Sequence, residues 1–220
     1  MSKKLEDYVV TASFNANSVY NGAFNDTQFT VVKKDTAITL NNLSYVEYSD
    51  VVNVSGRFTR SSGVAIKNAV IVVTVNGVSH NVKSDGEGYY SYSFTATKVG
   101  VNNVVVSFAG NSVYNAVNAA STFTVGKKET VMTIDPISTK QYMDDVVING
   151  RFTRSTGVAI KNAQIILTIN GQTYNTRTLA DGTFIYTFTA QTRGVNNVTA
   201  SFGGNSVYTD STDEITFSVV

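Results

Sequence analysis

Cysteine and tryptophan are absent from this chain of 220 residues, which contains a single proline and a single histidine. Without cysteine the chain has no disulfide bonds, no thiolate zinc sites and no cysteine nucleophiles. The histidine, His80, has Tyr174 as its counterpart in the second copy of an internal repeat, so a histidine-based catalytic or metal site would be confined to one copy. We therefore expect a protein that is not an enzyme and that needs no cofactor and no metal.

Neither sign of charge is in excess, because 17 basic side chains face 16 acidic ones and the net charge is +1. Such a balance lacks the excess of positive charge that would attract a nucleic acid or an anionic membrane. No apolar run approaches the roughly 18 residues that a membrane-spanning helix needs. The first residues, Met1–Asp7, lack the apolar core of a signal peptide. The sequence predicts no nucleic-acid partner and no membrane insertion, and any export signal would lie outside this piece.

The chain does contain a long internal repeat. The segments Gly56–Arg60 (GRFTR) and Gly63–Ala69 (GVAIKNA) recur at Gly150–Arg154 and Gly157–Ala163, a shift of 94 residues. At this shift the copies align without a gap and about half of the positions are identical, which is typical of one module present twice. We expect two complete domains of ordinary size.

The same shift sets the expected domain boundaries. The complete modules are predicted at residues 33–126 and 127–220. A partial copy precedes them, because Phe14 and Asn17–Tyr20 match Phe108 and Asn111–Tyr114. Residues 1–32 are thus the last two strands of a preceding module. A lone two-stranded hairpin is marginal in water, so its apolar face needs a cover. The cover is either the first complete module near Lys33–Asp35 or, as we expect, self-association through residues 1–32 with the same segment of a neighbouring chain.

Apolar residues alternate with polar ones throughout both modules, which is typical of half-buried strands. Asn76-Gly77 and Asn170-Gly171 supply the turn residues of tight hairpins. The sequence predicts an all-β fold of tandem antiparallel sandwiches with about seven strands per module. Positions 70, 105 and 121 are predicted to point outward. The inward positions of the first module are predicted to be Ile38, Leu40, Val52, Val54, Phe58, Ile71, Val73, Val75, Tyr90, Tyr92, Phe94, Val104, Val106, Phe108, Phe123 and Val125.

A family resemblance follows from the closing segment of each module. Val104–Asn111, then Tyr114 and Phe123–Val125, resembles the ending of tandem bacterial Ig-like domains of the group 3 type, and the turn at Asp181–Phe184 also fits that pattern. Phe108 stands where the family often has tyrosine. The resemblance covers essentially the whole chain. It implies an Ig-like sandwich from an adhesin-like surface protein of archaea or bacteria, with an extracellular location at the cell surface.

The predicted function is that of non-catalytic stalk or spacer repeats that contribute to adhesion. Junctions without Gly/Ser or Pro-rich linkers predict a semi-rigid rod. The alternatives are a binding module that recognises a glycan or a protein of a host or partner cell, and accessory repeats of a larger extracellular enzyme. Loops that bind would differ between copies, and the clearest differences are Val78–Gly86 against Gln172–Ala180 and Asn115–Ala120 against Thr209–Glu214.

Three kinds of modification or ion site are worth testing. Four Asn-x-Ser/Thr sequons, at Asn25, Asn42, Asn53 and Asn197, are candidate glycosylation sites. Calcium at the module junctions would use Asp35 or Glu129. An internal crosslink is suggested for charged residues that lie an even number of positions from inward-facing residues, because the strand alternation would bury them and a buried unpaired charge is costly. Those crosslink candidates are Lys34, Asp50, Lys128 and Asp144.

Overall fold

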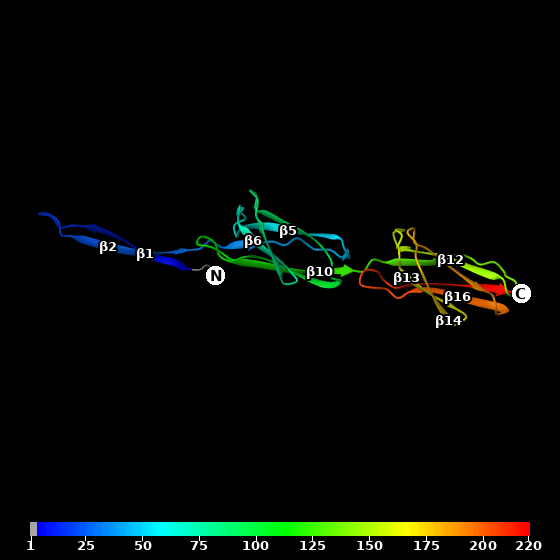
Figure 1. Cartoon of the computed structure of the whole chain (residues 1–220). Coiled ribbons are helices and arrows are strands. Elements are labelled where there is room, and N and C mark those ends of the chain that lie inside the picture. The colour runs from blue at the N-terminus through cyan, green and yellow to red at the C-terminus, as the bar shows by residue number, and fades with distance from the viewer. Residues whose placement is uncertain (1–3) are drawn as a thin grey trace. The chain divides into compact units, whose positions relative to one another are not determined.

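The computed structural model describes residues 4–220, which form seventeen β-strands and no helix (Figure 1). The strands are β1 (Lys4–Phe14), β2 (Ala23–Val32), β3 (Thr36–Ile38), β4 (Val46–Glu47), β5 (Val51–Arg60), β6 (Val70–Val75), β7 (Val78–Lys83), β8 (Tyr89–Thr95), β9 (Gly100–Phe108), β10 (Val117–Gly126), β11 (Thr130–Ile134), β12 (Asp145–Arg154), β13 (Gln164–Ile169), β14 (Gln172–Arg177), β15 (Thr183–Thr189), β16 (Gly194–Phe202) and β17 (Ser211–Val219).

The chain divides into two compact units, Met1–Val125 and Gly126–Val220. In the first, a three-stranded sheet β3-β5-β8 and a five-stranded sheet β4-β10-β9-β6-β7 form a sandwich, and β1 and β2 form a sheet of their own. In the second, the sheets are β11-β12-β15 and β14-β13-β16-β17. The second module has the seven strands expected, and the first has an eighth, the two-residue β4. The all-β sandwich prediction is confirmed.

Each sandwich encloses one apolar core. The fully enclosed Phe58 packs on Phe108, with ring centroids 4.7 Å apart, and Phe152 and Phe202 repeat this contact at the same distance. The inward phase predicted for the first module is confirmed, because every residue named for it is buried or half-buried. The prediction for position 121 was wrong. Ser121 and its counterpart Ile215 lie on the same strand face as Phe123 and Phe217, and Ile215 packs against the core.

The glycine of the GRFTR motif has a packing reason. Gly56 faces Tyr90 across the β5–β8 pair, and the Tyr90 hydroxyl donates a hydrogen bond over the glycine to the carbonyl oxygen of Thr39. A Cβ atom at position 56 would overlap that carbonyl and lie 2.6 Å from the tyrosine oxygen. Gly150 is crossed in the same way by the ring of Phe184. The motif therefore makes room for a buried aromatic side chain.

The predicted Asn-Gly turns are confirmed and are tied to the closing strand. Asn76 and Gly77 have φ values of 49° and 88°, as a type I′ turn requires. The Asn76 amide donates to the Oδ1 atom of Asn102 over 2.7 Å. Asn102 is 2% exposed, and its own amide donates to the carbonyl oxygens of Lys98 and Gly100. The second module repeats this pair as Asn170 and Asn196, so a buried asparagine holds the turn in both copies.

Candidate binding surfaces

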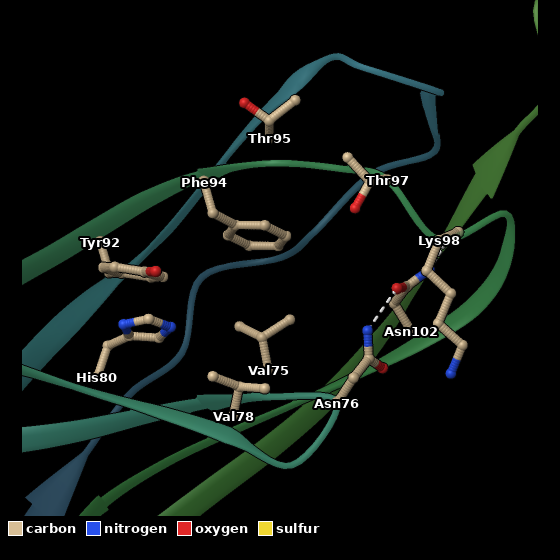
Figure 2. A pocket seen from close by; sticks show the side chains of 10 residues that line it. All are labelled: Val75, Asn76, Val78, His80, Tyr92, Phe94, Thr95, Thr97, Lys98 and Asn102. Carbon is tan, nitrogen blue, oxygen red and sulfur yellow. Dashed lines mark hydrogen bonds between the residues drawn. The ribbon is translucent and has the colours of Figure 1, made fainter. Parts of the chain in front are cut away.

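A pocket of about 210 Å³ opens in the first module between the edge strand β7 and the end of β8 (Figure 2). The Asn76-Gly77 turn brings β6 back as β7, so Val75 and Val78 lie together beneath the pocket. β8 belongs to the opposite sheet and presents Tyr92 and Phe94 toward them. The pocket is thus formed where the two sheets of the sandwich open along one side.

Aromatic rings form one wall of this pocket. His80 stacks on Tyr92 with ring centroids 4.5 Å apart, and Tyr92 stacks on Phe94 at 6.0 Å. His80 lies on the edge strand β7, and the stack leaves it only half-exposed. Rings that are covered on one side and open on the other are the usual lining of small-ligand sites.

Polar groups surround the opening. Thr95, Thr97 and the amine of Lys98 lie on the rim and are exposed. The second module keeps an aromatic pair at the same place, Tyr174 and Tyr186, with centroids 5.1 Å apart, but it has Thr192 in place of Lys98. In the second module the nearest cation in the sequence is Arg193, one position further on, and it lies over the ring of Tyr142.

The segments expected to be variable loops consist mostly of strand. Val78–Gly86 begins as β7, and Asn115–Ala120 runs into β10. The loop expectation was wrong because an edge strand tolerates substitution on its exposed positions as readily as a loop does. β7 nevertheless supplies Val78 and His80 to the pocket, so one of the two segments that differ between the copies lines a cavity.

The four crosslink candidates do not lie where their parity predicted. Lys34, Asp50 and Asp144 are exposed, and Lys128 is half-buried. In the first module the lysine and the aspartate lie at opposite ends of β5. Asp50 immediately precedes the first residue of β5, Val51. Lys34 lies near the other end, because its neighbour Asp35 accepts a hydrogen bond from the amide of Ser61, just after β5. A ten-residue strand spans roughly 30 Å. A bond between the lysine and the aspartate of one module is excluded by this separation.

The glycosylation and calcium candidates stay predictions. Asn25, Asn42, Asn53 and Asn197 are all exposed, as a glycan acceptor must be. Asp35 accepts a hydrogen bond of 2.7 Å from Asn115. No group of three or more histidine, cysteine, aspartate or glutamate side chains within residues 4–220 is arranged to hold a metal ion. The same part of the chain has no helix that could span a membrane.

The β1–β2 hairpin presents a second candidate surface. Tyr8, Val10, Phe14, Phe29 and Val31 share one face, and they are 43%, 52%, 48%, 50% and 37% exposed. Tyr8 and Phe29 stack at 5.3 Å, but the contact covers little of either ring. A contiguous face of this kind on a soluble protein is typical of an interaction site.

No protein-family model matches the sequence, and no well-characterised protein matches it either. Solved structures do resemble the chain. Invasin, described as a bacterial integrin-binding protein, is 18% identical with a TM-score of 0.49 over 84% of this chain and 39% of that one. A 1.5-MDa bacterial ice-binding adhesin is 17% identical with a TM-score of 0.38, and the match covers 97% of this chain and 73% of the adhesin structure. The fibronectin(III)-like modules of Clostridium thermocellum CbhA are 12% identical with a TM-score of 0.36, and the match covers 83% of this chain and 94% of theirs. All three TM-scores lie below 0.5.

Proposed function

We propose that this chain is a non-catalytic stalk segment of an adhesin-like protein at the cell surface. The observation that carries the proposal is the junction between the two repeated sandwiches. β10 ends at Gly126 and β11 begins at Thr130. Within that short connection the amide of Lys128 donates to the carbonyl oxygen of Val207 over 2.8 Å, and Lys128 accepts from Thr209 over 3.0 Å. A junction fixed to the following module favours a string of domains with restricted motion.

The pairing near the end of the second module suits a segment that carries tension. Residues 140–142 run parallel to the last residues of β17. Lys140 donates to Ser218 over 3.0 Å, Val220 donates to Lys140 over 2.9 Å, and Tyr142 donates to Val220 over 3.0 Å. When the two ends of the module are pulled apart along these parallel segments, the hydrogen bonds lie across the pulling direction, so they are sheared together rather than opened one at a time. The chain has no disulfide to share that load.

Small-angle scattering of the full chain tests the stalk proposal directly. We expect an extended particle with a narrow range of inter-module angles. A compact particle, or a wide distribution of angles, would contradict it. In single-molecule pulling, Lys140→Pro removes the amide that bonds to Ser218 and should lower the unfolding force of the second module. The unchanged first module, pulled in the same molecule, is the control.

A second candidate function is recognition of a glycan in the pocket of the first module. Its support is the combination of an aromatic wall, His80 and Tyr92, with the exposed hydroxyls of Thr95 and Thr97 and the amine of Lys98. A sugar presents both apolar C–H faces and hydroxyls, and the cationic rim favours one that bears a carboxylate. A glycan array on the full chain, repeated with Tyr92→Ala and Lys98→Thr, tests it. Signals unchanged in both variants would place any binding elsewhere.

A further inference from the structure

The first module has a polar hollow of about 480 Å³ on the outer face of its β3-β5-β8 sheet. Ser55 and Ser91 oppose each other across the β5–β8 pair, and their short side chains leave room between longer neighbours. Those neighbours are Asn41, Asn53, Lys83, Asp85 and Tyr89. The volume falls in the range of roughly 300–1,000 Å³ that is usual for small-ligand sites. No residue of this hollow lines the pocket beside His80, so the two are separate.

Asp85 supplies a carboxylate oxygen to the polar hollow. Its Oδ1 atom accepts from the amides of Glu87 and Tyr89 over 2.9 and 2.8 Å, so the turn holds the side chain in place. Within residues 4–220 no hydrogen bond uses its Oδ2 atom. A carboxylate that is already fixed through one oxygen can accept through the other with little further loss of side-chain entropy.

Two asparagine side chains are fixed in the same way, each through one end. Asn53 accepts from the Ser91 hydroxyl over 2.7 Å, which leaves its amide group to donate. Asn41 donates to the Ser55 hydroxyl over 3.0 Å, which leaves its carbonyl oxygen to accept. The exposed amine of Lys83 is a further donor, and it makes no ion pair in the described part of the chain. The hollow therefore offers open donors and open acceptors together.

Tyr89 adds an aromatic ring to these polar groups. The guanidinium of Arg57 lies over that ring, 5.4 Å from its centroid, and Arg57 Nε donates to the carbonyl oxygen of Glu87 over 2.9 Å. The ring is thus held in place while the residue stays 50% exposed. A fixed, exposed tyrosine offers an apolar surface with a hydroxyl at its edge.

The second module does not keep this set of groups, although it keeps the sheet. At the shift of 94 residues Asn53, Asp85, Tyr89 and Ser91 become Val147, Leu179, Thr183 and Ile185. The three apolar replacements are all exposed, so none of them was recruited into the core. The fold of a module does not require the polar groups of the hollow, which leaves them available for recognition in the first module.

We infer that the polar hollow binds a neutral carbohydrate. A hydroxyl both donates and accepts, so neighbouring hydroxyls of one sugar ring can donate to Asp85 Oδ2 and accept from the Asn53 amide. The C–H face of the ring packs on Tyr89. One amine and one carboxylate line the hollow, so it has no net preference for a charged ligand. The site does not depend on the pocket beside His80, whose rim carries Lys98 and favours an acidic sugar.

Binding of neutral carbohydrates to the full chain tests the inference. An array of neutral oligosaccharides of hexoses, deoxyhexoses and N-acetylhexosamines identifies the ligand, and calorimetry with the strongest one gives its affinity. The chain should have an intact mass equal to its sequence mass, so that no glycan attached to Asn53 fills the hollow.

Three variants then locate the site. Asp85→Asn keeps the acceptor of the turn but replaces the open acceptor by a donor, and it should weaken binding by about tenfold or more. Ser91→Ile introduces the residue of the second module, fills the hollow without touching the turn, and should abolish binding. Glu87→Gln is the matched control, because Glu87 is an exposed acid of the same turn that does not line the hollow, and it should change the affinity by less than about twofold.

The outcomes separate this site from the pocket beside His80. No binding to the array at protein concentrations up to about 1 mM would overturn the inference. Equal affinities of the Asp85→Asn and Glu87→Gln chains, or full binding by the Ser91→Ile chain, would overturn it as well. Binding that is lost in Tyr92→Ala but kept in Asp85→Asn and Ser91→Ile would belong to the other pocket, and the assignment made here would be wrong.

Discussion

Tyr90 gives the first module a sensitivity to high pH that the second module does not share. Burial raises the pKa of Tyr90 from 10 to about 12, because the ionised phenol would lie inside the core, where Tyr90 is 2% exposed. A folded-state pKa above the unfolded one stabilises the fold below pH 10, and this contribution is lost as pH rises toward 12. By pH 11.5 the loss amounts to about 2 kcal/mol. The second module has Phe184 at this position and has no such group to titrate.

The test compares the full chain with Tyr90→Phe. The substitution removes one hydrogen bond to Thr39, so at pH 8 it should cost about 1 kcal/mol. Between pH 10 and 12 the wild-type first module should lose stability faster than the variant, and the order of the two urea midpoints should reverse. Tyrosinate absorbance supplies a second reading, because one of the twelve tyrosines should titrate late in the wild type and be missing from the variant. Parallel losses in both proteins would refute the reasoning.

Three other predictions concern the cores and one turn. Phe58→Ala and Phe152→Ala should each destabilise their own module by about 3–5 kcal/mol in urea unfolding, and midpoints near wild type would refute the strand phase. Gly56→Ala should cost at least about 1–3 kcal/mol because of its overlap with Thr39, whereas Gly86→Ala, whose Cβ would enter open space, should be neutral. Hydrogen bonds from Thr183 lower the pKa of Asp181, so the stability it contributes is present at neutral pH and lost as pH falls below its ordinary value of 3.8; Asp181→Asn should remove that pH dependence in acid titrations.

The cores could be predicted from the sequence because the repeat provided its own control. At an inward position the residue differs in size between the two copies but stays apolar, as in Val54 and Ile148 or Val73 and Leu167. Such a pair identifies an inward position from the residue types alone. Parity failed where strands do not continue. Asp50 lies in the turn between Ser49, whose φ is 68°, and the first residue of β5, Val51. Because Asp50 is not part of the strand, the in-and-out alternation of β5 does not fix where its side chain points.

The pocket could not be predicted in the same way. His80 and Tyr92 come from different sheets, and their stacking depends on how far the two sheets separate along one side of the sandwich. A period of two residues says which face a side chain occupies and nothing about what lies opposite. The only signal in the sequence was that His80 and Val78 fall in a segment that differs between the copies.

The β1–β2 hairpin repeats five inward residues of the second module's closing strands, and this match has a consequence for folding. The hairpin's Val10, Ala12, Phe14, Phe29 and Val31 correspond to Val198, Ala200, Phe202, Phe217 and Val219. While the chain is unfolded, residues 127–193 meet two hairpins with the same five inward residues, and only one is correct. Repeat proteins are prone to misassembly of this kind. Tyr8 distinguishes the two, because a hairpin that carries it cannot place an asparagine against Asn170. Residue 8 is therefore one inward position at which the two hairpins differ, and residue 27 is another, where Thr27 stands in place of Ile215.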